Sequence, residues 1–167
     1  MRRHLVGRDR VRDIWVVIVI VAEKPSVARD IARVVGATAR GEGHLHGQGY
    51  IVTWAIGHLV TLCEPEAIDP AWKGWRFETL PMIPRAWPLS IIENTEQQFR
   101  VVARLITQAS TREVVCATDA GREGELIFRY IAEASRLDKP VKRLWISSLT
   151  EEAIRDGFEE AARRARL

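Results

Sequence analysis

Trp15–Ala22 has the sequence WVVIVIVA and is followed directly by Glu23 and Lys24, and this stretch decides the fold. Its β-branched residues do not alternate with polar ones, which predicts a strand covered on both faces, as in a parallel sheet. The whole apolar run is only nine residues long, whereas a membrane span needs about twenty. Arginines precede the run, but no small-residue cleavage site follows it, so we expect a cytoplasmic protein without a signal peptide or membrane anchor.

Strands and helices alternate along the rest of the chain. Apolar residues recur at helical spacing from Val27 to Val35, and Gly36 ends this helix. This order predicts an α/β fold with a Rossmann-like parallel sheet flanked by helices. Further strands are expected at 50–56, 113–118 and 141–146, and further helices at 95–109, at 121–137 and after the capping-box pair Ser148 and Glu151.

Two segments do not follow this alternation. Gly41–Gly49 is rich in glycine and is expected to form turns. Residues 64–90 are rich in proline and tryptophan, which predicts an irregular excursion. Because tryptophan side chains need a surface to pack on, we expect the excursion to lie along the body of the domain.

The positive charge of the chain is a property of its N-terminus. Residues 1–13 contain five of the 25 basic and two of the 22 acidic residues, so the remainder is neutral. Such a tail can hold phosphate groups nonspecifically, although a solvated arginine-rich end is the commoner explanation. We expect a basic extension over 1–14, one domain over 15–158, and the end of a helix over 159–167. Cys63 and Cys116 are expected to be free thiols.

Acidic residues follow two of the expected buried strands. Glu23 follows the first, Asp119 follows the strand at 113–118, and Glu123 lies in the first turn of the next helix. Carboxylates that meet at one sheet edge repel one another unless a cation neutralises them, and oxygen ligands favour Mg²⁺, with Mn²⁺ as a substitute. Lys24 and Arg122 lie beside these acids and suit a phosphate group. For any single acid, a helix cap or a neighbouring base is the simpler explanation.

Four segments stand out along the chain: VAEKPS (21–26), TWAIGHL (53–59), ATDAGREGE (117–125) and LWISSLTEEAI (144–154). Together they resemble type IA DNA topoisomerases of the topoisomerase III kind. In that family the metal-binding TOPRIM domain holds Mg²⁺ near the scissile phosphate. A tyrosine from another domain then attacks, which gives a 5′-phosphotyrosyl link. The four segments occur in this chain in the family's order.

The resemblance implies a role for each matching residue. It makes Glu23, Asp119 and Glu123 the metal site, and it adds a proton-transfer role for Glu123. Catalytic roles fall to Glu23, Lys24, Arg122 and Glu123, and contacts with single-stranded DNA to Lys24, His58, Trp75 and Arg122. His58 could instead satisfy a turn carbonyl, and Trp75 could be a core residue.

The chain departs from the family pattern in two ways. The family motif usually has a second aspartate where this chain has Gly121, which removes one ligand and is expected to weaken metal binding. The nucleophilic tyrosine belongs to a later domain, and neither Tyr50 nor Tyr130 has a context like the catalytic one. We therefore expect a catalytically incomplete, nucleoid-associated isomerase domain that works with the remaining topoisomerase domains.

Two alternatives to a topoisomerase domain stay open from the sequence. The chain could be a stand-alone TOPRIM nuclease or primase-like protein, which would need no tyrosine. It could also be a non-catalytic nucleic-acid-binding module. The sequence does not fix the oligomeric state, and a homo-oligomer is compatible with it.

Overall fold

The computed structural model describes residues 16–74, 76–146 and 148–164. Its main sheet has six strands in the order β2-β3-β4-β1-β7-β8, and a separate two-stranded ribbon is formed by β5 and β6. The strands are β1 (Val17–Ala22), β2 (Ala39–Gly41), β3 (His44–Gly47), β4 (Tyr50–Trp54), β5 (Val60–Leu62), β6 (Leu89–Ile91), β7 (Thr111–Ala117) and β8 (Val141–Arg143). The helices are α1 (Pro25–Val35), α2 (Pro65–Ile68), α3 (Glu96–Thr107), α4 (Arg122–Ala134) and α5 (Glu151–Arg164), with short 3-10 turns at Pro70–Trp72, Phe77–Thr79 and Glu93–Thr95.

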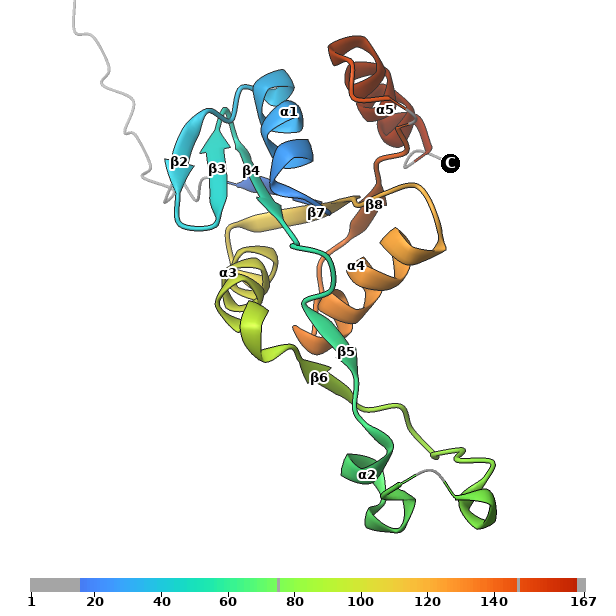
Figure 1. Cartoon of the computed structure of the whole chain (residues 1–167). Helices are drawn as coiled ribbons and strands as arrows, with labels where there is room; N and C mark the ends of the chain where they lie inside the picture. Colours follow the sequence, from blue (N-terminus) through green and yellow to red (C-terminus); the bar gives the residue numbers. More distant parts are fainter. Residues whose placement is uncertain (1–15, 75, 147, 165–167) are drawn as a thin grey trace, which may run out of the picture.

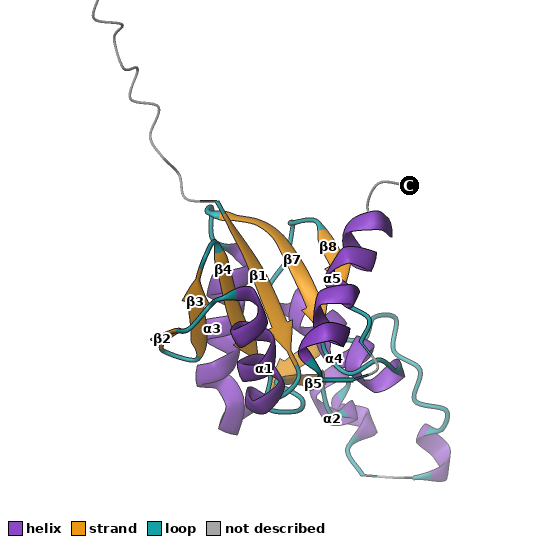
Figure 2. Cartoon of the chain, turned by 90° about the horizontal axis from the view of Figure 1, so that it is seen from above, coloured by secondary structure: helices purple, strands orange, loops and turns teal. Residues whose placement is uncertain are grey.

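The central strand β1 is covered by helices on both faces, as its sequence predicts. Val19 and Val21 belong to the core under α3 and α4, whereas Ile20 and Ala22 belong to the core under α1 and α5. Figure 1 shows these two helix pairs on opposite sides of the sheet, and Figure 2 shows the same layers from above. Each face of β1 is apolar because each contributes to a separate core. The predicted α/β fold with flanking helices is confirmed.

The strands that carry the acidic residues are parallel and end together. β1 pairs in parallel with both β4 and β7, and β7 pairs in parallel with β8. Ala22, the last residue of β1, is opposite Trp54 on one side and Ala117 on the other. The segments that follow these three strands therefore begin at the same edge of the sheet, where ligands of such sheets usually bind.

Two local predictions were wrong. Residues 41–49 are not a run of turns, because β2 and β3 form an antiparallel hairpin that continues into β4. The last helix is not capped by the Ser148 and Glu151 pair. Its first turn is capped by Thr150, whose Oγ1 accepts a hydrogen bond of 3.3 Å from the amide of Ala153.

The excursion at residues 64–90 does not lie along the body of the domain. Figure 1 shows α2 and the turns that follow it extending away from the sheet, beyond the β5-β6 ribbon. Several of its large apolar side chains are exposed: 91% for Phe77, 70% for Ile83 and 57% for Trp87. Trp87, one of the tryptophans of this segment, is thus more than half exposed, and the prediction that the segment lies along the body of the domain was wrong.

Two further expectations concern single features. Cys63 and Cys116 are both free thiols, as predicted. Among the helices of the described segments, none combines the length and apolar character that a membrane crossing requires.

A candidate metal and nucleic-acid site at the ends of three strands

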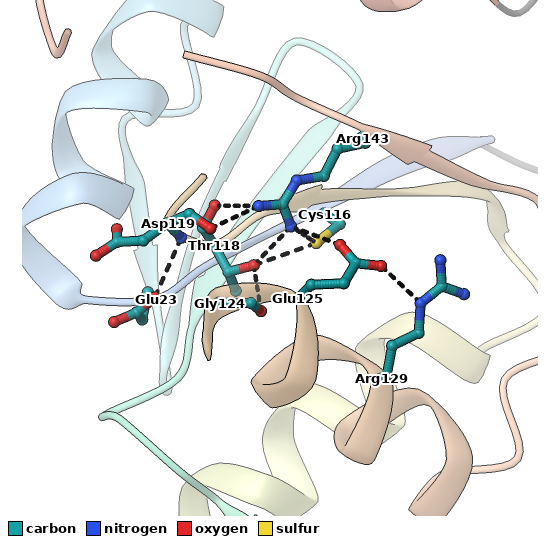
Figure 3. Close-up of polar contacts among 8 residues, drawn as sticks. All are labelled: Glu23, Cys116, Thr118, Asp119, Gly124, Glu125, Arg129 and Arg143. Carbon is teal, nitrogen blue, oxygen red and sulfur yellow. Dashed lines mark hydrogen bonds and ion pairs between the residues drawn. The ribbon is translucent and has the colours of Figure 1, made fainter. Parts of the chain in front are cut away.

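Glu23, Lys24 and Asp119 meet where β1 and β7 end. Oε2 of Glu23 accepts a hydrogen bond of 3.1 Å from the backbone amide of Asp119 (Figure 3). Nζ of Lys24 lies 3.9 Å from Oε1 of Glu23 and 3.6 Å from Oδ2 of Asp119. The Glu23 side chain is 11% exposed and that of Asp119 is 57% exposed. One carboxylate is therefore held by the fold, and the other faces solvent.

Glu123 and His58 form a second pair at this edge. Glu123 lies in the first turn of α4, and His58 lies in the connection between β4 and β5. Nε2 of His58 and Oε1 of Glu123 form a hydrogen bond. The hydrogen-bond partner that the structure gives His58 is this carboxylate, rather than the turn carbonyl that was the simpler alternative for it.

The other two predicted site residues have different outcomes. Arg122 is the first residue of α4 and is exposed. Trp75 lies outside the described residues. Of the predicted residues that the structure describes, it therefore brings Glu23, Lys24 and Asp119 into contact and joins His58 to Glu123.

Gly124 allows α4 to approach the loop that carries Asp119. A Cβ atom at position 124 would lie 2.2 Å from the carbonyl oxygen of Asp119 and 2.8 Å from its amide nitrogen. Any side chain at this position would therefore collide with backbone atoms. Gly121 is different, because it has an extended φ of −173° and open space around its Cα. No steric reason requires glycine at position 121.

Arg143 at the end of β8 holds the same loop, and sequence reasoning missed it. Its Nη2 donates hydrogen bonds of 2.6 Å to the carbonyl of Asp119 and 3.0 Å to the carbonyl of Thr118 (Figure 3). Its Nη1 donates one of 2.9 Å to Oγ1 of Thr118, and that hydroxyl donates one of 2.7 Å to the carbonyl of Gly124. The guanidinium also lies 5.0 Å from the ring centroid of Trp145. One arginine thus connects β7, α4 and β8 at the strand ends.

Glu125 forms an ion pair with Arg143 and is not grouped with the carboxylates of the acidic edge. Its Oε2 lies 3.2 Å from Nη1 of Arg143, and its Oε1 accepts a hydrogen bond of 2.7 Å from Nε of Arg129. Cys116 also contacts Arg143 through its Sγ. Burial nevertheless raises the pKa of the Cys116 thiol, so this group stays protonated at neutral pH.

The carboxylates at this edge fit a divalent cation after a rearrangement of side chains. Within residues 16–74, 76–146 and 148–164, no three acidic, histidine or cysteine side chains are yet grouped closely enough to hold a metal. Lys24 already places a positive charge between Glu23 and Asp119, and His58 is hydrogen-bonded to Glu123. The Lys24, Asp119 and Glu123 side chains are all more than half exposed, so they can rotate at small cost. The donor set, carboxylate oxygens with room for water, suits Mg²⁺ or Mn²⁺.

Neither tyrosine lies at this edge. Tyr50 is opposite Ile18, four residues before the aligned ends of β1 and β4, which is about 13 Å along the strand. Tyr130 is in α4 and packs, partly buried, against the core under α3 and α4. The geometry thus agrees with the expectation that neither is the nucleophile.

Comparison with known proteins gives one consistent answer. The family model described as the Toprim domain matches residues 18–149. The chain is 54% identical over 141 residues to DNA topoisomerase 3 of Shouchella clausii (strain KSM-K16), and 51% identical over 141 residues to that of Bacillus licheniformis. Each match covers 84% of this chain and 19% of the relative, so the chain spans about a fifth of the relatives' length.

Among solved structures, full-length topoisomerase I from Thermotoga maritima has a similar fold. The TM-score is 0.56 at 20% sequence identity, and the match covers 84% of this chain and 20% of that protein. At this identity the likeness concerns the fold alone. The family model and the relatives carry the assignment: the chain belongs to the Toprim domain family, in the branch that type IA, topoisomerase 3-like enzymes contain.

Proposed function

We propose that this chain binds a divalent cation and single-stranded DNA at the ends of β1, β4 and β7, and supports transesterification of a DNA phosphodiester by a nucleophile from outside the chain. One observation carries the proposal. Three carboxylates from two distant parts of the chain, Glu23 in one and Asp119 and Glu123 in the other, border one sheet edge together with Lys24 and His58. The relatives' name, DNA topoisomerase 3, agrees with chemistry on DNA.

Glu23, Asp119 and Glu123 would hold the cation. Mg²⁺ or Mn²⁺ bound there would offset the charge that develops on the phosphate oxygens. Glu23 is the most preorganised ligand, because its carboxylate already accepts a hydrogen bond from the backbone amide of Asp119. Asp119 and Glu123 are exposed and would turn towards the cation.

Lys24 would bind the scissile phosphate. Its ammonium group is 57% exposed and contacts two carboxylates only at 3.6 and 3.9 Å, so both bonds are weak. A cation that neutralised Glu23 and Asp119 would release Lys24 towards a phosphate oxygen, where a charge-assisted hydrogen bond is stronger. Arg122, exposed on α4, would hold a neighbouring phosphate.

His58 and Glu123 would transfer the proton that the cleavage reaction moves. Cleavage of the phosphodiester by a tyrosine hydroxyl releases one proton from the nucleophile and consumes one at the leaving 3′ oxygen. The His58–Glu123 pair holds a proton between Nε2 and Oε1 at the edge where the leaving oxygen would lie. A histidine paired with a carboxylate in this way is suited to general acid–base transfer.

The test uses this chain with and without the remainder of a topoisomerase 3 polypeptide. Alone, with Mg²⁺, the chain should neither relax supercoiled plasmid nor form a covalent adduct with labelled single-stranded DNA, because a nucleophile and its metal site act as a unit. With the remainder added, both activities should appear. They should then fall at least roughly a hundredfold with Glu123→Gln.

The same gels separate the alternatives. Asp138→Asn is the matched control, since Asp138 is exposed and pairs with its neighbour Lys139, and it should leave activity unchanged. Metal-dependent nicking by the chain alone, without an adduct, would favour a nuclease over the proposal. An adduct abolished by Tyr50→Phe or Tyr130→Phe would place the nucleophile within this chain.

A further inference from the structure

A hollow on the α1 side of the sheet is lined by arginines, and Glu23, Asp119 and Glu123 are not among its lining residues. It has a volume of about 430 Å³ and is bounded by the second half of α1, the β2-β3 hairpin and the end of β4. Figure 1 shows this hairpin beside α1 on the outer side of the sheet. The cationic or aromatic groups of its lining are Arg29, Arg33, Arg40, His44 and Trp54.

The charge of this hollow is not balanced by its own lining. Arg29 and Arg33 are one turn apart on α1, Arg40 comes from β2, and none of the described residues that line the hollow carries a carboxylate. Arg33 pairs with Asp30 at 3.1 Å. In the part of the chain that the structure describes, Arg29 and Arg40 have no carboxylate partner. Like charges gathered around one hollow repel each other unless an anion enters it.

The dipole of α1 does not account for all three arginines. Cations stabilise the last turn of a helix, and Arg33 is in that turn. Arg29 is in the middle of the helix, where this effect has faded, and Arg40 is outside it. A solvated charged face would explain each side chain singly, but not their arrangement around one hollow.

The wall of the hollow is aromatic and apolar. Trp54 is half-buried, and Ala32, Ala37 and Leu45 also line the hollow. The Nδ1–H group of His44 donates a hydrogen bond of 2.8 Å to the carbonyl of Glu42, which leaves Nε2 free for a ligand. The His44 ring occupies the space beside Gly41, where a Cβ would come within 2.4 Å of Nε2. Guanidinium groups beside an indole suit a phosphate that carries a base.

We infer that this hollow is a binding site for a nucleotide unit, with the phosphate held by Arg29 and Arg40 and the base against Trp54. A strand of nucleic acid can reach it from the acidic edge. Lys24 and Arg33 are nine residues apart along α1, which is about 14 Å of helix rise. A free nucleotide has the same chemistry, so the experiment must distinguish the two sources. The inference does not depend on the proposed metal site.

The experiment compares two double variants with equal loss of charge. Arg29→Ala/Arg40→Ala empties the hollow of its unpaired arginines. Arg100→Ala/Arg155→Ala is the control, because these exposed arginines pair with Glu96 and Glu151 on their own helices. Binding of a labelled oligothymidylate is followed by fluorescence anisotropy in EDTA. Binding of inorganic pyrophosphate and of a nucleoside diphosphate is followed by calorimetry.

The first variant should bind the oligonucleotide roughly tenfold more weakly and lower its log-log salt slope by about 0.7, which is the contribution of the one phosphate of a single strand that the two arginines neutralise. The control should stay within about twofold of the unmodified chain. Tighter binding of the diphosphate than of the oligonucleotide, abolished in the same variant, would support a free nucleotide as the ligand. Equal losses of affinity in both variants, or no binding of any of the three ligands, would overturn the inference.

Discussion

The backbone amide of Asp119 donates a hydrogen bond of 3.1 Å to Oε2 of Glu23, and this bond joins the ends of two parallel strands that are 96 residues apart in the chain. The bond fixes the Glu23 carboxylate through the backbone rather than through another side chain. The position of Asp119 therefore depends on whatever holds its loop. Gly124 and Arg143 hold that loop from opposite sides.

Gly124→Ala should destabilise the domain. Alanine normally favours a helix over glycine by up to about 1 kcal/mol, but here its Cβ would lie 2.2 Å from the Asp119 carbonyl oxygen. Relief of that clash must move α4 or the loop, at a cost of about 1–3 kcal/mol. Urea unfolding measures the decrease in stability.

The matched control is Gly121→Ala, three residues earlier. Its Cβ would meet nothing within 4 Å, and its backbone is extended. We expect a change within about 0.5 kcal/mol. Equal effects of the two substitutions would show that the close approach at Gly124 does not constrain the loop.

Arg143→Ala should loosen the loop without removing any proposed ligand. The carbonyls of Thr118 and Asp119 and the hydroxyl of Thr118 would lose their donor, which costs about 1–3 kcal/mol for each buried group left unpaired. Arg143→Lys keeps the charge but not the forked geometry of the guanidinium, so its stability and Mn²⁺ affinity should be close to those of Arg143→Ala. Unfolding free energy and Mn²⁺ affinity should fall together.

Arg129→Ala is the control for this substitution. Arg129 also pairs with Glu125, but its side chain is 65% exposed and this pair lies within α4. Its removal should cost at most about 0.5 kcal/mol and leave Mn²⁺ affinity unchanged. An Arg143→Ala protein with normal Mn²⁺ affinity would show that the arginine supports the fold alone.

The ends of β1 and β7 could be predicted because both strands stand out in the sequence as apolar runs that are followed by an acidic residue. Val19–Ala22 is apolar on both faces, and such a run is hard to mistake for a surface strand. The β2-β3 hairpin was missed because its strands have only three and four residues and include glycines, which indicate turns. Arg143 was missed because its partners are mostly backbone carbonyls and a hydroxyl, and these leave no charge pattern in a sequence.

The sequence also could not predict which exposed side chains pair with one another. The sequence placed Glu123 with Glu23 and Asp119, but the bond to His58 depends on where the β4-β5 connection passes the start of α4. Glu125 shows the same limit, since its partner Arg143 is 18 residues away on another element.

Gly121→Asp should strengthen metal binding. The position borders the Asp119 loop, has open space and has a backbone that any residue adopts. An added carboxylate beside the edge supplies a further oxygen ligand, so Mn²⁺ affinity should rise roughly tenfold. A drop in affinity would show that position 121 faces away from the cation.

Deletion of residues 1–13 tests whether the basic extension contributes to DNA binding. The deleted segment carries five arginines and two aspartates. If it binds phosphates, the deletion should weaken binding of single-stranded DNA and flatten the log-log salt dependence by about 0.7 for each phosphate that the extension had neutralised. An unchanged slope would show that the body of the domain holds the DNA.

The central claim is that Glu23, Asp119 and Glu123 bind a divalent cation, and an Mn²⁺ titration followed by electron paramagnetic resonance tests it most directly. The chain should bind Mn²⁺ saturably at one site, and Mg²⁺ should compete for that site. Asp119→Asn should weaken binding roughly tenfold, because it removes a charged ligand beside Glu23. Asp138→Asn, which removes the same charge from an exposed residue elsewhere, should leave the titration unchanged. Identical titrations for the unmodified chain and Asp119→Asn would contradict the claim.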